Sequence, residues 1–277
     1  MLTPRATVVM PAYDEAAVIE RTLGALLDES EPGEFDVIVV ANGCTDDTAA
    51  VVRRAFPCVR VLELAEGSKP AAINAGLALA RTAPVLMLDA DVVLDTTSAR
   101  ALVETAREPG VDAAIAPMEI DAEGVTPVVR AFYAAWLCHP YFDGGKFAAA
   151  YALSASGLAR LGELPRVTAD DEYVARRMDV VRTAAGAVFR VAPPRTLDAL
   201  LAVRTRSRRG TAQLGRRSRR AVLGAAATFA LRLVRQPARW PAAFVYLAVV
   251  LAARLRAARA PAATSWERDL TSREARS

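Results

Sequence analysis

The chain has 277 residues and 53% hydrophobic content, enough for one large domain or for one domain with an appendage. Its formal charge of +4 is unevenly distributed: residues 1–203 hold 18 Lys and Arg against 28 Asp and Glu, and residues 204–277 hold 17 Arg against 3 acids. Few aromatic residues interleave with the arginines of this basic tail and no recognition fold is evident, so we expect no nucleic-acid partner.

The cysteines and the N-terminus indicate a cytoplasmic protein. Cys44, Cys58 and Cys138 form no close pair and show no metal-ligand spacing, which is typical of reduced thiols. The first apolar run is too short for a signal peptide.

Apolar strands and helices alternate from the N-terminus. Asp14 is expected to cap the first helix, and Ser68 with Pro70 to begin the third. Such continuous apolar strands predict an α/β fold with a mostly parallel sheet covered on both faces, and ligands of such sheets bind beyond the carboxyl ends of the strands. The expected strands are 6–13, 35–42, 59–64, 83–91, 111–117 and 187–193, and the expected helices are 15–28, 45–56, 68–81, 97–107, 126–137 and 171–178, with a further strand and helix within 146–162.

Two aspartates end the fourth expected strand, in the run VLMLDADVVLD over residues 85–95. Side chains at i and i+2 point the same way along a strand, so the carboxylates of Asp89 and Asp91 can converge. Adjacent carboxylates repel unless a cation is present, and such oxygen ligands suit Mg²⁺ or Mn²⁺. The pair predicts a divalent-cation site; the alternative is a polar turn that ends the strand.

Four segments together resemble family-2 glycosyltransferases with the GT-A nucleotide-sugar fold. VVMPAYDE, DVIVVANGCTDDT, GSKPAAINAG and VLMLDAD occur in this order at matching spacing, and the resemblance covers about residues 5–200. It implies a GT-A catalytic domain over 1–203, followed by an Arg-rich helical tail over 204–277. It also implies an inverting reaction in which the Asp-X-Asp pair holds the metal on the donor diphosphate.

The resemblance also implies a set of donor-binding residues. Asn42 stands where the family usually has an aspartate, so the identity of the base stays open. Lys69 would help to neutralise the charge of the donor phosphates. The alternative is that Lys69 is a solvated surface lysine with no ligand. For residues 42–46 the alternative is a turn followed by a helix cap. The implied donor-nucleotide residues are Pro11, Ala12, Tyr13, Glu15, Asn42, Lys69, Asn74 and Asp89.

The segment TADDEYVARRM over 168–178 resembles the family's TEDTDLSLRL, with Ala169, Asp170 and Asp171 covering its TED triplet. The resemblance implies that Asp171 is the catalytic base, with Asp170 as its neighbour, and places Arg177 on the motif's arginine. A second carboxylate beside the base would keep it basic. The alternative is that these acids stabilise a helix N-terminus.

The basic tail contains two uncharged runs, 221–231 and 240–253, each bracketed by arginines. The second run has 14 residues, short of the ~20 needed to span a membrane. Trp240, Phe244 and Tyr246 with the flanking arginines suit an interfacial helix. The tail therefore predicts peripheral attachment to the anionic inner face of the cell membrane; the alternative is a pair of helices packed on the catalytic domain.

From these patterns we expect an inverting, metal-assisted glycosyltransferase. It would move a sugar from a nucleotide-diphospho-sugar to a hydroxyl of a glycan, a lipid-linked molecule or a small molecule. One alternative is a nucleotidyltransferase of sugar phosphates, although PAYDEAAVIE lacks a Gly-rich phosphate loop. Another is a catalytically silent nucleotide-binding or membrane-scaffold protein. A dinucleotide oxidoreductase is disfavoured because no G-x-G-x-x-G follows the first strand.

Overall fold

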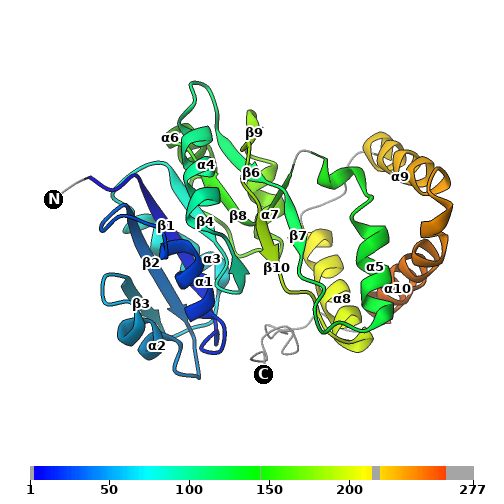
Figure 1. Cartoon of the computed structure of the whole chain (residues 1–277), viewed down its shortest axis with the longest axis horizontal. Helices are drawn as coiled ribbons and strands as arrows, with labels where there is room; N and C mark the ends of the chain where they lie inside the picture. The colour runs from blue at the N-terminus through cyan, green and yellow to red at the C-terminus, as the bar shows by residue number, and fades with distance from the viewer. Residues whose placement is uncertain (1–2, 144, 214–218, 260–277) are drawn as a thin grey trace. The chain divides into compact units, whose positions relative to one another are not determined.

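The computed structural model describes residues 3–143, 145–213 and 219–259 (Figure 1). The described residues form two compact units, which we call the sheet unit (3–119 and 145–191) and the helical unit (120–143, 192–213 and 219–259). These units do not coincide with the predicted ranges 1–203 and 204–277, because segment 120–143 packs with the C-terminal helices. The division into functional domains stays a prediction.

A seven-stranded, mostly parallel sheet forms the sheet unit, in the order β3-β2-β1-β4-β8-β6-β9. Parallel pairing joins β1 to β2 and to β4, and β2 to β3, whereas β8 runs antiparallel to both of its neighbours. A second sheet has the order β5-β10-β7. The strands are β1 Ala6–Ala12, β2 Phe35–Asn42, β3 Arg60–Leu64, β4 Val85–Leu88, β5 Val92–Val93, β6 Ala113–Ala116, β7 Met118–Ile120, β8 Lys146–Leu153, β9 Val181–Thr183 and β10 Phe189–Val191.

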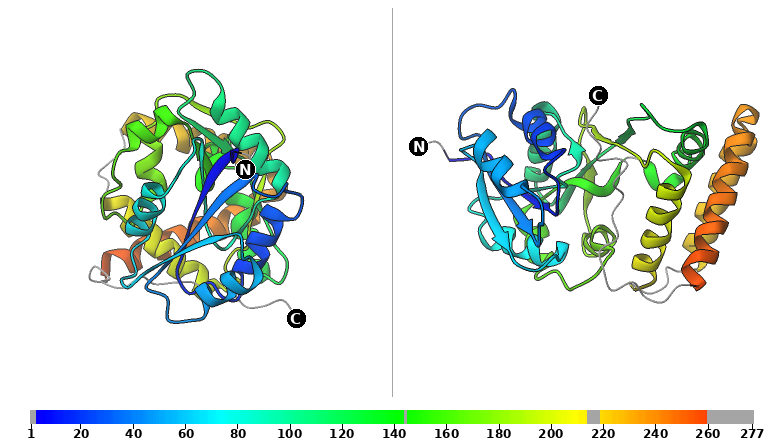
Figure 2. Two further views of the ribbon diagram at one scale, coloured as in Figure 1. Left: turned by 90° about the vertical axis from the view of Figure 1, so that its left-hand side faces the viewer. Right: turned by 90° about the horizontal axis from the view of Figure 1, so that it is seen from below.

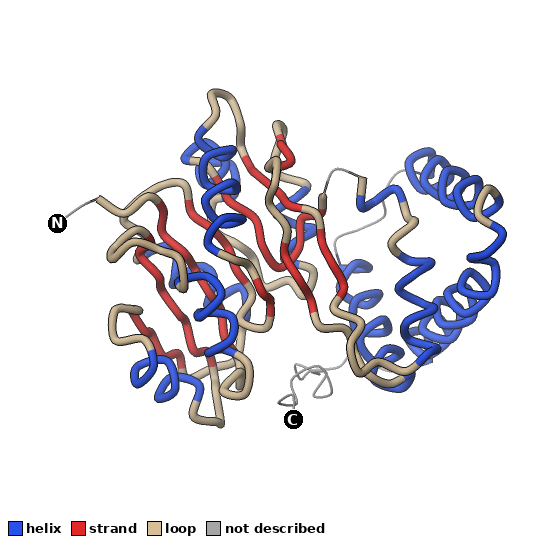
Figure 3. The backbone as a smooth tube through the Cα atoms, viewed as in Figure 1, coloured by secondary structure: helices blue, strands red, loops and turns tan. Residues whose placement is uncertain are grey.

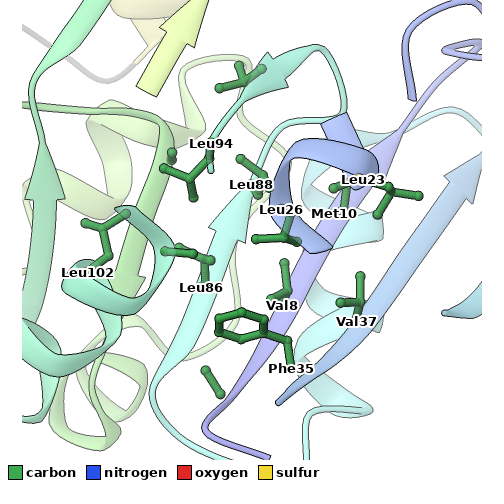
Figure 4. Packing of buried hydrophobic residues seen from close by; sticks show 14 of the residues in the cluster. Val8, Met10, Leu23, Leu26, Phe35, Val37, Leu86, Leu88, Leu94 and Leu102 are labelled. Atoms are coloured by element: carbon green, nitrogen blue, oxygen red, sulfur yellow. The ribbon is translucent and has the colours of Figure 1, made fainter. Parts of the chain in front are cut away.

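Helices cover both faces of the large sheet, which confirms the predicted architecture. Successive strand residues point to opposite faces, so Val8, Leu23 and Leu102 belong to the core on one side (Figure 4) and Val9 and Ile73 to the core on the other. The first face carries α1 Ile19–Leu27, α2 Thr48–Ala55 and α4 Thr96–Arg107, and the second carries α3 Lys69–Ala78, α6 Ala155–Leu161 and α7 Asp170–Ala175.

The local sequence predicts the start of one helix correctly and that of another incorrectly. Helix α3 begins as predicted, because the Ser68 hydroxyl accepts a hydrogen bond from its first turn and Pro70 needs no donor there. The expectation that Asp14 caps α1 is wrong, since α1 begins at Ile19. Asp14 instead has a φ of 49°, and its carboxylate accepts hydrogen bonds from the backbone N–H groups of Thr45 and Asp46. It joins the end of β1 to the β2–α2 loop.

The helical unit consists of helices and loops (Figure 3). In it α10 lies against α5 and α8, as Figures 1 and 2 both show. Phe132, Trp136 and Tyr246 stack at this junction, and the Arg204 guanidinium lies 4.8 Å from the Trp136 ring centroid. Its elements are α5 Pro127–Trp136, η1 Pro140–Phe142, α8 Leu197–Gln213, α9 Arg219–Val234, η2 Pro237–Arg239 and α10 Trp240–Arg259.

The apolar run at the end of the chain belongs to a longer helix than the sequence suggested. Pro237–Arg259 has 23 residues and is long and apolar enough to cross a membrane, by length and composition alone. The expectation that this segment is too short to span is therefore wrong, because the helix continues through the flanking arginines.

Candidate active site

Asn42 joins three segments at the carboxyl edge of the sheet. Its Nδ2 donates to the carbonyl of Ala12 at 2.7 Å, and its Oδ1 accepts from the N–H of Ser68 at 2.8 Å. The residue is buried, so these bonds fix the ends of β1 and β2 against the start of α3. Its contact with a donor base stays a prediction.

Two glycines bring the loops around Asn42 close together. A Cβ added at Gly43, which has a φ of +65°, would lie 2.4 Å from the backbone nitrogen of Gly67. A Cβ added at Gly67 would lie 3.1 Å from the ring of Tyr13. The Tyr13 ring therefore packs against the backbone of Gly67. A side chain at Gly67 would displace Tyr13, and a side chain at Gly43 would displace the loop that contains Gly67.

The other residues expected along the base and ribose are more deeply placed. Pro11 and Ala12 are buried within β1, while Tyr13 is half-buried just beyond it. Glu15 is also buried, and its N–H donates to the hydroxyl of Thr48 at 2.8 Å. Among these four residues, Tyr13 offers the most accessible side chain to a ligand.

The turn after β4 presents Asp89 and Asp91. The N–H of Asp89 donates to the carbonyl of Ala149 at 2.7 Å, and Ala149 has a φ of 53°, in the left-handed region that alanine seldom adopts. From α1, the Thr22 hydroxyl binds the carbonyl of Ala90 at 2.9 Å and Arg21 binds the carbonyl of Asp91 at 3.2 Å. Hydrogen bonds to the backbone of the turn therefore hold it in place, and they do not use the carboxylates of Asp89 and Asp91.

Lys69 brings two carboxylates together from distant parts of the chain. Its Nζ lies 2.8 Å from Oδ1 and 3.1 Å from Oδ2 of Asp89, and 3.0 Å from Oδ2 of Asp170. The side chains are 17% exposed for Lys69, 29% for Asp89 and 8% for Asp170. The ammonium therefore bridges the strand-end acid and the first residue of α7 in a largely desolvated setting.

Charge and burial oppose each other within this group. Burial alone would lower the pKa of Lys69, but the charges of Asp170, Asp89 and Asp171 outweigh it and hold that pKa well above its usual range. Burial raises the pKa of Asp89; Lys69 opposes the shift, and the nearby charge of Asp91 adds to it. Lys69 therefore stays charged at neutral pH, and the charge of Asp91 adds to the effect of burial in opposing the ionisation of Asp89.

The predicted donor residue Asn74 lies in α3 but binds protein backbone. Its Nδ2 donates to the carbonyl of Leu164 at 2.8 Å, and its Oδ1 accepts from the N–H of the same residue at 2.9 Å. Leu164 is buried in the segment that leads to α7, which begins at Asp170. Asn74 thus fixes that segment, and direct contact with the donor stays a prediction.

The two acids at the start of α7 have different surroundings. Asp170 is buried and bridged to Lys69, whereas Asp171 is half-buried. Burial, and then the charges of both acids, raise the pKa of buried Tyr151. Arg177 lies over the ring of Tyr173, with its guanidinium carbon 4.7 Å from the ring centroid. The sequence did not single out Tyr151 or Ala149, because neither lies in a recognisable motif.

A different acidic group lies in the loops beside β1 and β2. Ligand atoms of Asp14, Cys44 and Asp46 lie within 4.8 Å of one another. The carboxylates of this group already accept hydrogen bonds from loop N–H groups, and burial raises the pKa of the Cys44 thiol. These hydrogen bonds explain the cluster, because they hold the two loops together. We assign no metal to it.

Comparison with solved structures shows a shared fold. A mannosyltransferase from Pyrobaculum calidifontis, solved with GDP-Man and Mn²⁺, aligns with a TM-score of 0.66 at 23% identity, covering 94% of this chain and 88% of that one. Glucosyl-3-phosphoglycerate synthase from Mycobacterium tuberculosis, solved with Mn²⁺ and UDP, aligns with a TM-score of 0.54 at 22% identity, covering 76% and 78% of the two chains.

Sequence comparison gives a relative and a family. Validoxylamine A glucosyltransferase from Streptomyces hygroscopicus subsp. limoneus is 35% identical over 95 residues, which are 32% of this chain and 21% of that protein, so the chain matches about a fifth of its relative's length. Residues 7–148, which include the strand ends, Lys69 and the Asp89 turn, match the family described as Glycosyl transferase family 2. The chain belongs to glycosyl transferase family 2.

Proposed function

We propose that the chain transfers a sugar from a nucleotide-diphospho-sugar to an acceptor hydroxyl, with inversion at the anomeric carbon. The single observation that carries this proposal is the bridge through Lys69, which joins the strand-end acid Asp89 to the helix-start acid Asp170. The reaction needs one group that binds the leaving diphosphate and another that takes the proton from the acceptor hydroxyl.

In the proposed reaction an α7 carboxylate takes the proton of the acceptor hydroxyl as its oxygen attacks the anomeric carbon. The bond from that carbon to the diphosphate oxygen breaks, and the nucleoside diphosphate leaves with the electron pair. The geometry favours Asp170 as the base, because its carboxylate lies beside Lys69 and Asp89. Asp171, which the sequence motif implied, is the second candidate.

Lys69 would stabilise the departing diphosphate, since its high pKa keeps the ammonium charged where it lies between Asp89 and Asp170. Asp89 and Asp91 would hold a divalent cation; their oxygen donors and mutual repulsion fit Mg²⁺ or Mn²⁺. When bound, such a cation offsets negative charge on the diphosphate.

Tyr13 and the backbone around Gly43 and Gly67 would form the nucleoside side of the site. The solved neighbours bind GDP-Man, UDP or UDP-GlcNAc, so the proposal names the donor class and leaves the base open. The acceptor is likewise proposed only as a hydroxyl compound.

A donor screen tests the proposal. Purified full-length chain is incubated with Mn²⁺ and UDP-, GDP- or dTDP-sugars, with acceptor mixtures present, and nucleoside diphosphate release is measured. We expect release with one nucleotide class and its loss in a Lys69→Met variant. Pyrophosphate formation from a nucleoside triphosphate and a sugar 1-phosphate, without diphosphate release, would instead identify a nucleotidyltransferase.

A further inference from the structure

Helix α10 leaves an unbroken apolar stripe exposed along its length. Its opposite side packs against α5 and α8, where Val249 and Ala253 are buried. The exposed side chains follow helical spacing, so they share one face. They are Trp240 (50% exposed), Phe244 (72%), Leu247 (58%), Leu251 (58%) and Leu255 (48%).

The stripe is surrounded by positive charge. Residues 219–259 contain eight arginines and no Asp or Glu. Arg235, Arg239, Arg254, Arg256 and Arg259 are exposed near the two ends of α10. Two copies of this surface facing each other would bring arginine against arginine, so the charge pattern favours an anionic partner over a second copy.

The neighbouring helix adds a further arginine beside this surface. Arg208 of α8 and Arg254 of α10 are both exposed, and the two helices pack against each other. Partial burial and then the charge of Arg254 lower the pKa of Arg208. Exposed guanidinium groups are suited to a phosphate group, which accepts bidentate hydrogen bonds and offsets their charge.

The surface is held in place by bonds within the helical unit. The Trp240 indole N–H donates to the carbonyl of Leu233 at 3.1 Å, which fixes the corner between α9 and α10. Arg232 pairs with Asp143 through its two terminal nitrogens, with Nη1 donating to Oδ1 at 2.8 Å and Nη2 donating to Oδ2 at 2.6 Å. Docking would therefore require little rearrangement of this unit.

We propose that the exposed face of α10, with Arg208 and Arg254 beside it, docks the chain on the surface of an anionic phospholipid membrane. The apolar stripe enters the boundary between headgroups and acyl chains, and the arginines bind lipid phosphates. The helix lies along the surface and does not cross it. Crossing would either strip α10 from α5 and α8 or carry Arg206, Arg208 and Arg209 of α8 into hydrocarbon, which is costly.

Co-sedimentation of the full-length chain with vesicles tests this surface without requiring sugar transfer. Vesicles of phosphatidylcholine alone are compared with vesicles that also contain phosphatidylglycerol, at increasing NaCl concentration. We expect binding to the anionic vesicles that weakens as salt rises. Leu247→Glu/Leu251→Glu should lower the partition coefficient about tenfold or more, and Arg208→Gln about fivefold. Leu79→Glu, at a 38% exposed leucine of the sheet unit, is the matched control and should bind like wild type.

Four outcomes would overturn the proposal. The chain could stay in the supernatant with both vesicles, or bind both equally at every salt concentration. Retention in cell membranes after alkaline carbonate extraction would show a spanning helix instead. A vesicle-free dimer in light scattering that Leu247→Glu/Leu251→Glu abolishes would assign the stripe to a second copy. Far-UV circular dichroism of each variant confirms that it is folded, and Arg208→Gln remains informative if the double variant is not.

Discussion

Asn74 and Leu164 exchange two hydrogen bonds across ninety residues of sequence, one in each direction. The pair fixes the segment before Asp170 against α3, the helix that carries Lys69. Lys69 and Asp170, which form the salt bridge, are therefore also held in place by the hydrogen bonds between Asn74 and Leu164.

Asn74→Ala should destabilise the protein by about 2 kcal/mol, because it leaves a donor and an acceptor of buried Leu164 without partners. Turnover should fall with it, since Asp170 loses its support. Urea unfolding and nucleotide release measure the two effects. Asn74→Asp keeps the acceptor for the Leu164 N–H but sets a carboxylate oxygen against the Leu164 carbonyl, so it should be no more stable than Asn74→Ala. A clearly more stable Asn74→Asp would show that the hydrogen bond donated by Asn74 contributes nothing.

Lys69→Met should destabilise the protein by about 2–3 kcal/mol, because it leaves two carboxylates close together in a largely buried setting. The partial exposure of Asp89 keeps this below the value for a fully buried pair. Arg53→Met removes a surface bridge to Glu63 and should cost no more than about 1 kcal/mol. Denaturant unfolding at neutral pH compares the two, and similar losses would argue against a special role for the Lys69 bridge.

Asn substitutions distinguish the two candidate bases. Asp170→Asn should lower turnover by on the order of 10²–10⁴ with little change in donor affinity, and Asp171→Asn should have a smaller effect. Single-turnover kinetics with the donor found in the screen, together with donor titration, gives both quantities. The reverse order of effects would return the base to Asp171, as the motif alone implied.

A divalent cation should strengthen nucleoside diphosphate binding about tenfold or more, through Asp89 and Asp91. Calorimetric titration with Mn²⁺, and again with EDTA, measures the difference. Asp91→Asn should remove most of it, whereas Glu104→Gln on the exposed side of α4 should not. Identical affinities in the two conditions would exclude a cation at this turn.

Asp112 should contribute stability that depends on pH. Burial opposes its ionisation, but hydrogen bonds from the N–H groups of Val180 and Asp179 and from the Ser156 hydroxyl lower its pKa. A lowered folded-state pKa gives stability that is present above the ordinary pKa of about 3.9 and is lost as the pH falls through the folded value. Asp112→Asn should therefore be less stable than wild type at pH 7, and the difference should narrow by about pH 3. Urea unfolding at both pH values measures it; a constant difference would contradict the linkage.

Much of the sheet unit could be predicted because its signals are local. The short apolar run of β2 favours a buried strand, and Ser68 followed by Pro70 favours a helix start. Asp14 was misassigned because its partners, Thr45 and Asp46, lie in another loop that competes for its carboxylate. The bridge from Lys69 to Asp170 could not be predicted, since a motif names residues without showing which of two adjacent acids turns inward.

The uncharged run 240–253 predicts a shorter helix than α10, because α10 continues through Arg254, Arg256 and Arg259. Arginines at helix ends continue the backbone hydrogen bonding while their long side chains reach solvent, so charge does not mark where α10 stops. The exposed stripe was visible in part, through Trp240 and Phe244, but which face packs against α5 and α8 depends on tertiary structure.

The hydrogen bonds of Asn42 limit which residue can stand at this position. Its amide donates to the carbonyl of Ala12, where a carboxylate oxygen would instead meet another oxygen at 2.7 Å. An aspartate introduced here alone would therefore remove the donor and set two oxygens against each other, although the two side chains are nearly the same size. Redesign of this edge of the sheet should accordingly change position 42 together with the backbone that surrounds it.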